Sequence, residues 1–360
     1  MNLESTLQAI QPPDCTLLSQ AQSRLDCLTK PVGSLGRLEE LAAQYVAIRG
    51  DLTPTIPEAM VMTLAADHGV VAEGVSAYPS SVTAQMVENF LVGGAAVNVL
   101  ARHVHAQVRI VDMGVASNLQ EAKGLILKKI GHGTQNFCKG PAMSRREALQ
   151  ALETGIDLAK EAYDEGIGLV AIGDMGIGNS TASAAITAVM AGHSVAMVTG
   201  RGTGLDDVGL AHKVKIIEQA LACNQPQSHD AIDVLSKVGG YEIGGMAGII
   251  LGAAACRIPI VLDGFIAGAS ALLAVGLNPV CREFLVASHL SVEQGHRLVL
   301  DHLKLQPLLD LQLRLGEGTG ACLAIGLIQA SLKIYLEMAT FEEAKVDGTL
   351  SHQFGSSIGS

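Results

Sequence analysis

Short runs of apolar residues, each ended by Gly, Asp or His, recur along the chain. They span residues 59–66, 108–111, 168–172, 194–199, 258–262 and 284–287, and each contains Val or Ile. Continuous apolar runs bounded by turn residues are typical of strands buried on both faces of a sheet. Ala- and Leu-rich stretches of helical length lie between most of them. This alternation predicts an α/β fold with a mainly parallel sheet of about six strands, flanked by helices.

The pattern changes toward both ends of the chain. Helical stretches are expected at residues 3–29 and 34–48, on either side of a Lys-Pro-Val-Gly-Ser turn, and at residues 291–303 and 320–338. We expect residues 1–48 and 291–345 to form a small helical domain beside a large α/β substrate-binding domain of residues 49–290. The segment 346–360 is polar and rich in Ser and Gly, which predicts a flexible tail.

The composition indicates a large core and an excess of glycine. Of the 360 residues, 49% are apolar, which excludes a mainly disordered chain. The chain has 40 Gly and no Trp, and only 3% of its residues are aromatic. So few rings argue against a platform for stacking single-stranded nucleic acid.

The charge balance narrows the possible partners. The formal net charge is −11, from 24 basic and 35 acidic residues. Nucleic acids and anionic membranes both need basic patches, so neither is an expected partner. An anionic small molecule would have to be held by local backbone N–H groups against this overall field.

The cysteines, the N-terminal stretch and the lengths of the apolar segments indicate the cellular location of the protein. The seven cysteines include no Cys-x-x-Cys pair, which favours a reduced cytoplasmic setting. The N-terminal stretch has neither the basic nor the apolar region of a signal peptide. The uncharged segments near residues 243–256 and 264–281 are shorter in their apolar part than the roughly 20 residues of a membrane span. We therefore predict no membrane span.

The first candidate site is the sequence GDMGIGNST at residues 173–181. It follows a predicted strand and leads into a helix, so its glycines can expose backbone N–H groups to an anion. It fits neither the dinucleotide fingerprint nor the P-loop pattern. The alternative interpretation is a tight structural turn.

A second glycine-rich sequence, TGRGTGLDD at residues 199–207, follows another predicted strand. Its alternating glycines suggest a phosphate or sugar cradle, to which Lys213 could add a cation. A solvated lysine is the alternative for Lys213.

The third candidate is RLGEGTGA at residues 314–321, where Glu317 stands between two glycines at the start of an apolar helix. Glu317 either caps that helix or faces a pocket as a general base, and its spacing alone leaves both open. The histidines and cysteines show no zinc-ligand spacing, so we expect no metal site.

With these segments in place, the chain resembles the nicotinate-nucleotide–dimethylbenzimidazole phosphoribosyltransferase family. The resemblance runs from residue 30 to residue 321 through KPVGSLGRLE, AADHGV, VSAYPSSVTAQM, GDMGIGNST, DVLSKVGGYEIGGMAG, VLDGF and RLGEGTGA. It implies a Rossmann-like sheet domain, a small helical domain from both termini and a homodimer. It also implies transfer of 5-phosphoribose from nicotinate mononucleotide to 5,6-dimethylbenzimidazole, with inversion, in cobalamin synthesis and with no cofactor.

The resemblance also assigns roles to individual residues. It makes Glu317 the general base that takes the proton of the attacking benzimidazole. The expected benzimidazole pocket consists of Tyr78, Pro79, Met86 and Leu315. The expected nucleotide and phosphate site consists of Asp174, Gly176, Gly202, Lys213 and Ser291. Family members often carry Glu at the position of Asp174. The Asp side chain is shorter by one methylene, which changes any ribose or nicotinate contact expected at this position.

Two alternatives belong to other functional classes. A nicotinamide-dependent oxidoreductase on the same fold would need a dinucleotide fingerprint, which the sequence lacks. A non-catalytic protein that senses a nucleotide or a benzimidazole would not need the carboxylate of Glu317. The sequence leaves open which base is the preferred acceptor.

Overall fold

The computed structural model describes residues 2–347, and its centre is a single parallel sheet. The six strands lie in the order β3-β2-β1-β4-β5-β6, and every neighbouring pair is parallel. This is the Rossmann strand order, so the expected α/β fold is confirmed. The strands are β1 (Ala59–Ala66), β2 (Gln107–Gly114), β3 (Leu125–Leu127), β4 (Leu169–Met175), β5 (Ile260–Leu262) and β6 (Leu285–Ala287).

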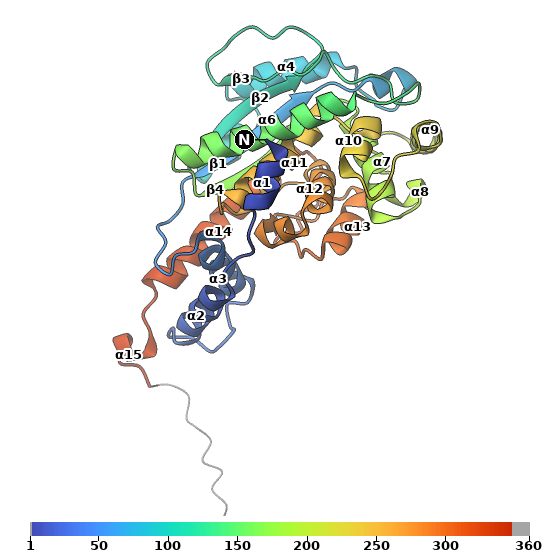
Figure 1. The fold of residues 1–360 in the computed structure, drawn as a ribbon. Helices are drawn as coiled ribbons and strands as arrows, with labels where there is room; N and C mark the ends of the chain where they lie inside the picture. Colours follow the sequence, from blue (N-terminus) through green and yellow to red (C-terminus); the bar gives the residue numbers. More distant parts are fainter. Residues whose placement is uncertain (1, 348–360) are drawn as a thin grey trace, which may run out of the picture.

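Helices connect the strands and cover both faces of the sheet (Figure 1). The short 3-10 helices are η1 (Gly69–Glu73) and η2 (Pro279–Phe284). The α-helices are α1 (Leu3–Ala9), α2 (Cys15–Asp26), α3 (Arg37–Arg49), α4 (Ser81–Leu91), α5 (Ala96–His103), α6 (Arg145–Asp164), α7 (Asn179–Ala191), α8 (Val195–Val198), α9 (Asp207–Asn224), α10 (Ala231–Val238), α11 (Tyr241–Ala255), α12 (Phe265–Leu277), α13 (Gln294–Leu303), α14 (Thr319–Glu337) and α15 (Phe341–Ala344).

Alternate residues of the central strand enter two different cores. Met60, Met62 and Leu64 of β1 belong to the core formed with α6, α11 and α12. Ala59 and Val61 belong to the core formed with α3, α5 and α14. All eight residues of β1 are therefore buried, which explains why its sequence is continuously apolar instead of alternating.

The tightest helix pair of the first core depends on glycine. A Cβ at Gly155 of α6 would lie 1.9 Å from the carbonyl oxygen of Gly245 in α11. A Cβ at Gly248 of α11 would lie 2.0 Å from the carbonyl oxygen of Leu152 in α6. The two backbones thus approach each other more closely than any other residue type allows.

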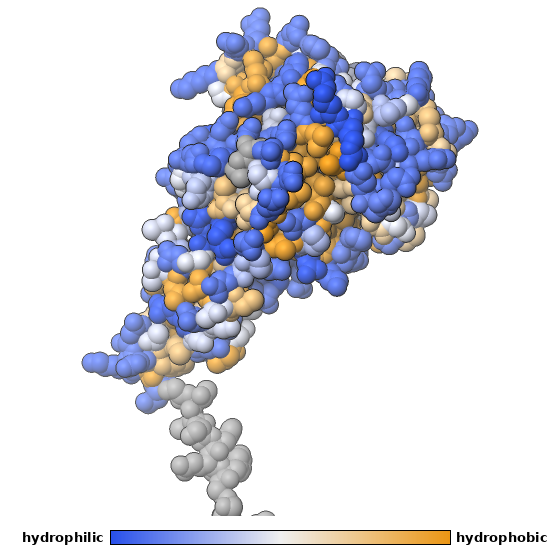
Figure 2. All heavy atoms as spheres, viewed as in Figure 1, coloured by the Kyte–Doolittle hydropathy of each residue, from blue (hydrophilic) through white to orange (hydrophobic). Residues whose placement is uncertain are grey.

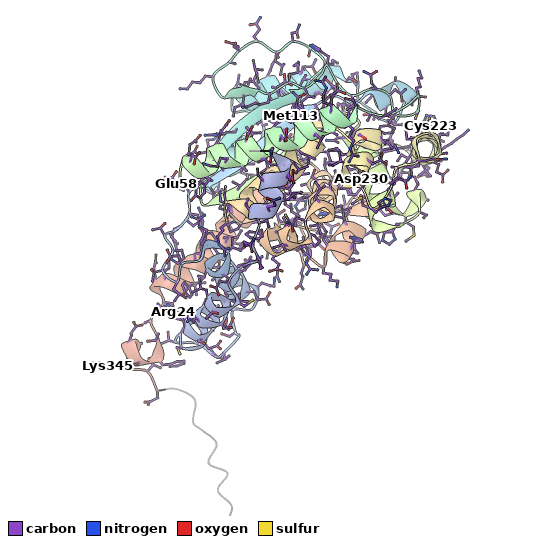
Figure 3. The ribbon with its side chains drawn as sticks, viewed as in Figure 1. Arg24, Glu58, Met113, Cys223, Asp230 and Lys345 are labelled. Carbon is purple, nitrogen blue, oxygen red and sulfur yellow. The ribbon has the colours of Figure 1, made fainter. Side chains whose placement is uncertain are left out.

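Helices from both ends of the chain lie side by side away from the sheet (Figure 1). The C-terminal half of α14 packs on α3, and α3 packs on α2. Arg24 of α2 lies in this helical group (Figure 3), where its Nε donates to the carbonyl oxygen of Tyr335 at 2.9 Å. In contrast, α1 contacts α6 and α11, and α13 contacts α7 and α12. The domain boundaries at residues 48 and 291 stay a prediction.

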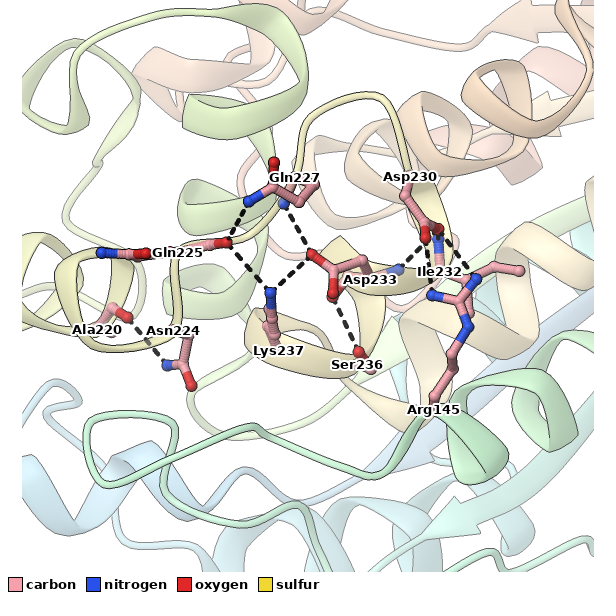
Figure 4. Close-up of polar contacts among 10 residues, drawn as sticks. All are labelled: Arg145, Ala220, Asn224, Gln225, Gln227, Asp230, Ile232, Asp233, Ser236 and Lys237. Carbon is pink, nitrogen blue, oxygen red and sulfur yellow. Dashed lines mark hydrogen bonds and ion pairs between the residues drawn. The ribbon is translucent and has the colours of Figure 1, made fainter.

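The connection between α9 and α10 is fixed by polar contacts at its end (Figure 4). Asp230 caps α10 by accepting the backbone N–H groups of Ile232 and Asp233, and Arg145 of α6 pairs with its carboxylate at 2.8 Å. Lys237 donates to Asp233 one turn earlier in α10, at 3.0 Å. These contacts fix the start of α10 against α6.

Three sequence predictions about individual elements were wrong. Residues 194–199 form no strand, because Val195 and Val198 are buried at helical spacing in α8 while Met197 between them is exposed. The expected helix 3–29 is two helices, since Pro12 and Pro13 cannot continue the backbone ladder of α1. The three-residue edge strand β3 was missed because its apolar run is too short to stand out. The predicted tail 346–360 lies outside the described residues from 348 onward.

One helix of the described part, α14, is long and apolar enough to cross a membrane. More than half of that stretch, 56%, is buried inside the protein, where it contacts α3, α5 and β4. These contacts are those of a core helix. Figure 2 shows mostly polar side chains on the visible face, with an apolar area near α1 and α12.

The α6–α11 contact leads to a stability prediction. Gly248→Ala places a methyl group against the backbone of Leu152, which cannot move aside as a side chain can. We expect a loss of about 1–3 kcal/mol in the free energy of unfolding, measured by denaturant titration. Gly326→Ala on α14 is the matched control, because its Cβ would meet only a methyl of Val104 at 3.4 Å. Equal effects of the two substitutions would contradict this account of the contact.

Candidate functional site

A cavity of about 440 Å³ opens at the carboxyl ends of β4, β5 and β6, next to the point where the strand order reverses. Ligands of open α/β sheets bind at this place. Its walls come from the turns after these strands, from α4, from the loop between α8 and α9 and from the loop before α14. The lining residues are Tyr78, Val82, Met86, Asp174, Met175, Gly176, Ile177, Asn179, Ser180, Gly202, Thr203, Gly264, Phe265, Ile266, His289, Ser291, Glu293, Arg314, Leu315, Gly316 and Glu317.

One end of the cavity is formed by the turn between β4 and α7. Gly176 packs against β1 so closely that a Cβ there would lie 2.3 Å from the carbonyl oxygen of Ala66. Asn179 and Ser180 open the 13-residue helix α7 and line the cavity. The N-terminus of a helix attracts anions through its free N–H groups and its dipole. This end of the cavity is therefore suited to a phosphate.

The second glycine-rich loop brings Lys213 to the same place. Gly202 has a left-handed φ of 53°, and a Cβ there would lie 2.9 Å from Ser180 Oγ and 3.3 Å from Lys213 Nζ. Lys213 Nζ donates to Ser180 Oγ at 2.9 Å. The Lys213 side chain is buried, and this burial lowers its pKa to about 8. Lys213 thus lies directly behind the cavity wall, with Ser180 between its ammonium group and the interior.

The opposite end of the cavity is apolar and partly open. Tyr78 and Leu315 are 52% and 57% exposed at its rim, and Val82 and Met86 of α4 lie deeper in the wall. Pro79 is exposed and is not among the lining residues. A flat apolar ring fits such a surface, and methionine adapts to rings of different shape.

Glu317 is held between these two ends in a backbone conformation that non-glycine residues rarely adopt. Gly316, Glu317 and Gly318 have φ values of 84°, 66° and 101°, all in the left-handed region. An unfavourable conformation of this kind persists only where the surroundings enforce it, and it is most common at functional sites. The loop directs the Glu317 carboxyl group into the cavity wall.

Three neighbours enforce that conformation. Thr63 Oγ1 on β1 donates to the carbonyl oxygen of Glu317 at 2.8 Å. The buried carboxylate of Asp263 accepts the backbone N–H groups of Gly318 at 3.1 Å and Ala321 at 3.0 Å. Gly173 of β4 leaves the necessary room, because a Cβ there would lie 2.3 Å from the Glu317 carbonyl oxygen.

The carboxyl groups around the cavity are buried with few partners. Glu317 is 5% exposed, and burial raises its pKa although the backbone N–H of Val97 opposes the shift. Burial and the nearby charge of Asp263 raise the pKa of Asp174 to about 8. Oδ1 of Asp174 and Oε2 of Glu317 accept no hydrogen bond from the described residues. Across residues 2–347 no three such groups form a cluster that could hold a metal ion.

A buried contact between a histidine and a glutamate lies behind the glycine turn. His68 Nε2 and Glu242 Oε1 are 2.6 Å apart, and both side chains are inaccessible to solvent. A Cβ at Gly178 would lie 3.1 Å from the His68 Cβ, so the turn rests on this pair. His68 and Glu242 therefore support the phosphate end of the cavity without lining it.

The structure brings together all the residues predicted from the sequence except two. Pro79 stays outside the cavity, and Lys213 reaches it only through Ser180. Their individual roles remain predictions. Sequence reasoning missed Glu293 and Arg314 in the wall, and Asp263 and Thr63 as supports. Asp263 directly follows an apolar strand, which was the available signal, whereas nothing in the sequence pairs Thr63 with Glu317.

Comparison with known proteins defines the class of enzyme to which this fold and site correspond. A family model described as phosphoribosyltransferase matches residues 10–346, nearly the whole chain.

Named relatives define the family more closely. The chain is 59% identical over 344 residues to the nicotinate-nucleotide–dimethylbenzimidazole phosphoribosyltransferase of Geobacter sulfurreducens, covering 96% of this chain and 98% of that protein. It is 56% identical over 350 residues to the protein of the same name from Roseiflexus sp. RS-1, covering 97% and 99%. The crystal structure of the Thermus thermophilus protein superposes with a TM-score of 0.88 at 46% identity, covering 93% of this chain and 100% of that one. The chain belongs to the nicotinate-nucleotide–dimethylbenzimidazole phosphoribosyltransferase family.

Asp174 leads to a pH-dependent stability prediction. Its folded pKa of about 8 exceeds the ordinary value of 3.8, so the folded protein retains a proton that the unfolded chain releases. The contribution of Asp174 to the free energy of unfolding therefore falls as the pH rises from about 4 to about 8. Asp174→Asn keeps the acceptor for Asn179, which donates at 2.8 Å, and removes the charge. We expect it to unfold at a higher temperature than the wild type at pH 8, with the difference shrinking toward pH 4.

The size of the effect follows from linkage. Each unit of pKa difference corresponds to about 1.4 kcal/mol, so a gain of a few kcal/mol is expected at pH 8. Thermal unfolding from pH 5 to pH 9 measures it, with the exposed Asp301→Asn as a control. A temperature difference that does not change with pH would contradict the raised pKa.

Proposed function

We propose that the protein transfers 5-phosphoribose from nicotinate mononucleotide to 5,6-dimethylbenzimidazole. The products are nicotinate and α-ribazole 5′-phosphate, used in the nucleotide loop of cobalamin. The observation that carries this proposal is the strained, buried Glu317 between a phosphate-binding end and an apolar end of one cavity. The family membership of the chain supports the same reaction.

The phosphate end would bind the 5′-phosphate of the donor. Gly176 and Gly202 let the backbone approach it, and Ser180 and Ser291 present hydroxyl groups from two walls. Lys213 supplies the positive charge from behind Ser180. Because the chain carries a net charge of −11, this local arrangement must overcome repulsion of an anion by the whole protein. A bound phosphate would also keep Lys213 protonated despite its burial.

The apolar end would bind the acceptor base. Tyr78, Met86 and Leu315 offer flat or flexible apolar surfaces on two sides of the opening. The exposed positions of Tyr78 and Leu315 let the ring enter from solvent without a large rearrangement. Pro79 would act from outside the cavity, by setting the start of α4, where its carbonyl oxygen accepts the N–H of Val82 at 3.1 Å.

The reaction needs one proton acceptor. Nicotinate leaves the ribose as a ring with an uncharged nitrogen, so its departure requires no acid. The benzimidazole attacks C1′ through one nitrogen and loses the proton on the other, which Glu317 would accept. Burial raises the pKa of Glu317 and makes its carboxylate a stronger base. Attack on the face opposite nicotinate inverts C1′ from β to α.

The buried carboxylates would also stabilise the transition state. As the bond to nicotinate breaks, positive charge moves from the pyridinium ring to the ribose. Asp174 and Glu317 both line the cavity, and each contributes a carboxyl oxygen that has no partner among the described residues. Negative groups positioned in advance stabilise a developing cation without reorganisation. Asp174 would act here when it is ionised.

Replacing Glu317 tests the proposed reaction. Glu317→Gln keeps the shape of the side chain and removes the proton acceptor, so we expect kcat to fall by about 10²–10⁴-fold. Binding of dimethylbenzimidazole, measured by calorimetry, should be retained. Products of nicotinate mononucleotide with a panel of bases are read by mass spectrometry. Glu337→Gln, exposed at the far end of α14, is the matched control.

The pH profile gives a second readout of the same experiment. Because the pKa of Glu317 is raised above its ordinary 4.5, the base form is lost as the pH falls through a value higher than 4.5. We expect wild-type kcat to decline on this acid side and the Gln variant to lack that decline. Unchanged turnover in the variant would exclude general-base catalysis by Glu317. Absence of an α-riboside from every base would overturn the proposed function.

We also propose that the enzyme is a cytoplasmic homodimer. All seven cysteines are free, which supports a reducing compartment. Figure 2 shows an apolar area near α1 and α12, and a second subunit over this area would remove apolar surface from water. Sedimentation equilibrium should give twice the mass of the chain at micromolar concentration. A monomer under these conditions, with full activity, would contradict the dimer.

A further inference from the structure

A third carboxyl group, Glu293, lies in the cavity wall at the phosphate end. It comes just before α13, and its backbone N–H donates to Ser291 Oγ at 3.3 Å. Its side chain reaches across to the loop between α8 and α9, where a Cβ at Gly200 would lie only 2.0 Å from Glu293 Oε2. Glu293 borders both the main cavity and a neighbouring one of about 490 Å³ behind Gly202.

An acidic side chain in this position needs an explanation. The neighbouring Gly202, Ser180 and Ser291 form the end of the cavity suited to a phosphate, and a carboxylate there repels a phosphate dianion. Oε2 of Glu293 is inaccessible to solvent and accepts no hydrogen bond from residues 2–347. Oε2 lies against Gly200 and is closed to a ligand, so only the other carboxylate oxygen, Oε1, is available to a donor that a ligand brings.

The ligand implied by the proposed function restricts what that donor can be. In a phosphoribosyl group, the phosphate and the ring oxygen only accept hydrogen bonds, and the hydroxyl groups on C2′ and C3′ are the donors. The free oxygen of Glu293 can accept one of these hydroxyl groups. Resting on the proposed function, we propose that Glu293 binds a ribose hydroxyl group of the donor and makes the enzyme select ribose over deoxyribose.

The other carboxyl groups of the cavity are less suited to this role. Asp174 already accepts the side-chain amide of Asn179 on one oxygen and lies beneath Gly316 at the loop of Glu317. Glu317 lies in that loop, adjoining Leu315 of the apolar rim, where the base enters. A second possible role for Glu293 is to serve only as a counter-ion, since its charge favours the protonated form of Lys213. The two roles can be told apart, because only binding of a ribose hydroxyl group makes the effect of a Glu293 substitution depend on which hydroxyl groups the donor carries.

The test compares three donors with three forms of the enzyme. The donors are nicotinate mononucleotide and its 2′-deoxy and 3′-deoxy analogues, and the enzymes are the wild type, Glu293→Ala and Glu293→Gln. A hydrogen bond to a charged group predicts that the wild type favours the ribose donor by about ten- to a hundredfold in kcat/KM. Glu293→Ala should lower kcat/KM for the ribose donor by the same ten- to hundredfold and change kcat/KM little for at least one deoxy donor.

The Gln variant and a control keep the result interpretable. Glu293→Gln retains an acceptor oxygen without the charge, so its selectivity should lie between those of the wild type and the Ala variant. Glu218→Gln, exposed on α9, removes the same charge away from the cavity. Equal losses with all three donors in the Glu293 variants would assign the counter-ion role and overturn the proposal.

A binding measurement separates this inference from the proposed reaction. Calorimetry with ribose 5-phosphate and 2-deoxyribose 5-phosphate requires no turnover. A preference for ribose 5-phosphate that disappears in Glu293→Ala supports the inference even if no α-riboside is ever formed. Turnover by an enzyme that binds both sugar phosphates equally would leave the proposed function intact and overturn the role of Glu293. Turnover by an enzyme that binds neither sugar phosphate would have the same two consequences.

Discussion

The carboxylate of Asp263 joins the end of the sheet to the loop that carries Glu317. It comes directly after β5 and accepts two backbone N–H groups at the start of α14, those of Gly318 and Ala321. These bonds fix the first turn of a helix whose preceding residues have left-handed backbone angles. Because a carboxylate at a helix N-terminus is favoured by the exposed N–H groups and by the dipole, the same contact stabilises the helix and orients the loop. Thr63 and Gly173 hold Glu317 itself, through a hydrogen bond to its carbonyl oxygen and through close packing against it.

The cavity as a whole combines excess negative charge with a local site for an anion. Asp174, Glu293 and Glu317 each have a carboxyl oxygen without a partner among the described residues, while Lys213 is a buried cation behind the phosphate end. A ligand with an anionic phosphate, hydroxyl groups and a cationic ring would satisfy both kinds of group at once. Nicotinate mononucleotide has this distribution of charge, with the pyridinium ring at the opposite end of the sugar from the phosphate. The acidity of the site is therefore compatible with a phosphorylated substrate.

The sequence predicted the architecture better than the details of packing. The six-stranded parallel sheet was predictable because strands buried on both faces are continuously apolar, as β1 is. The run at 194–199 failed because four apolar residues fit a helical turn as well as a strand. Glu317 could be singled out from its flanking glycines, which are a local signal. Its support by Thr63 and Asp263 could not, since these contacts join residues separated by more than 50 positions. That Asp263 and Glu293 lie near Glu317 could be recognised only from the fold, which brings the turns after β5 and β6 beside α14.

Helix α14 links two regions that are far apart in the structure. Its first turn is anchored beside the cavity, and its last turns pack against α3 and receive the guanidinium of Arg24 on the carbonyl oxygen of Tyr335. Tyr335 in turn donates its hydroxyl to the carbonyl oxygen of Leu52 at 2.8 Å. This helix of 19 residues is a continuous connection between the α2 and α3 group and the loop that carries Glu317. Residues of α2 and α3, which do not line the cavity, thus contact the same helix whose first turn is bound by Asp263.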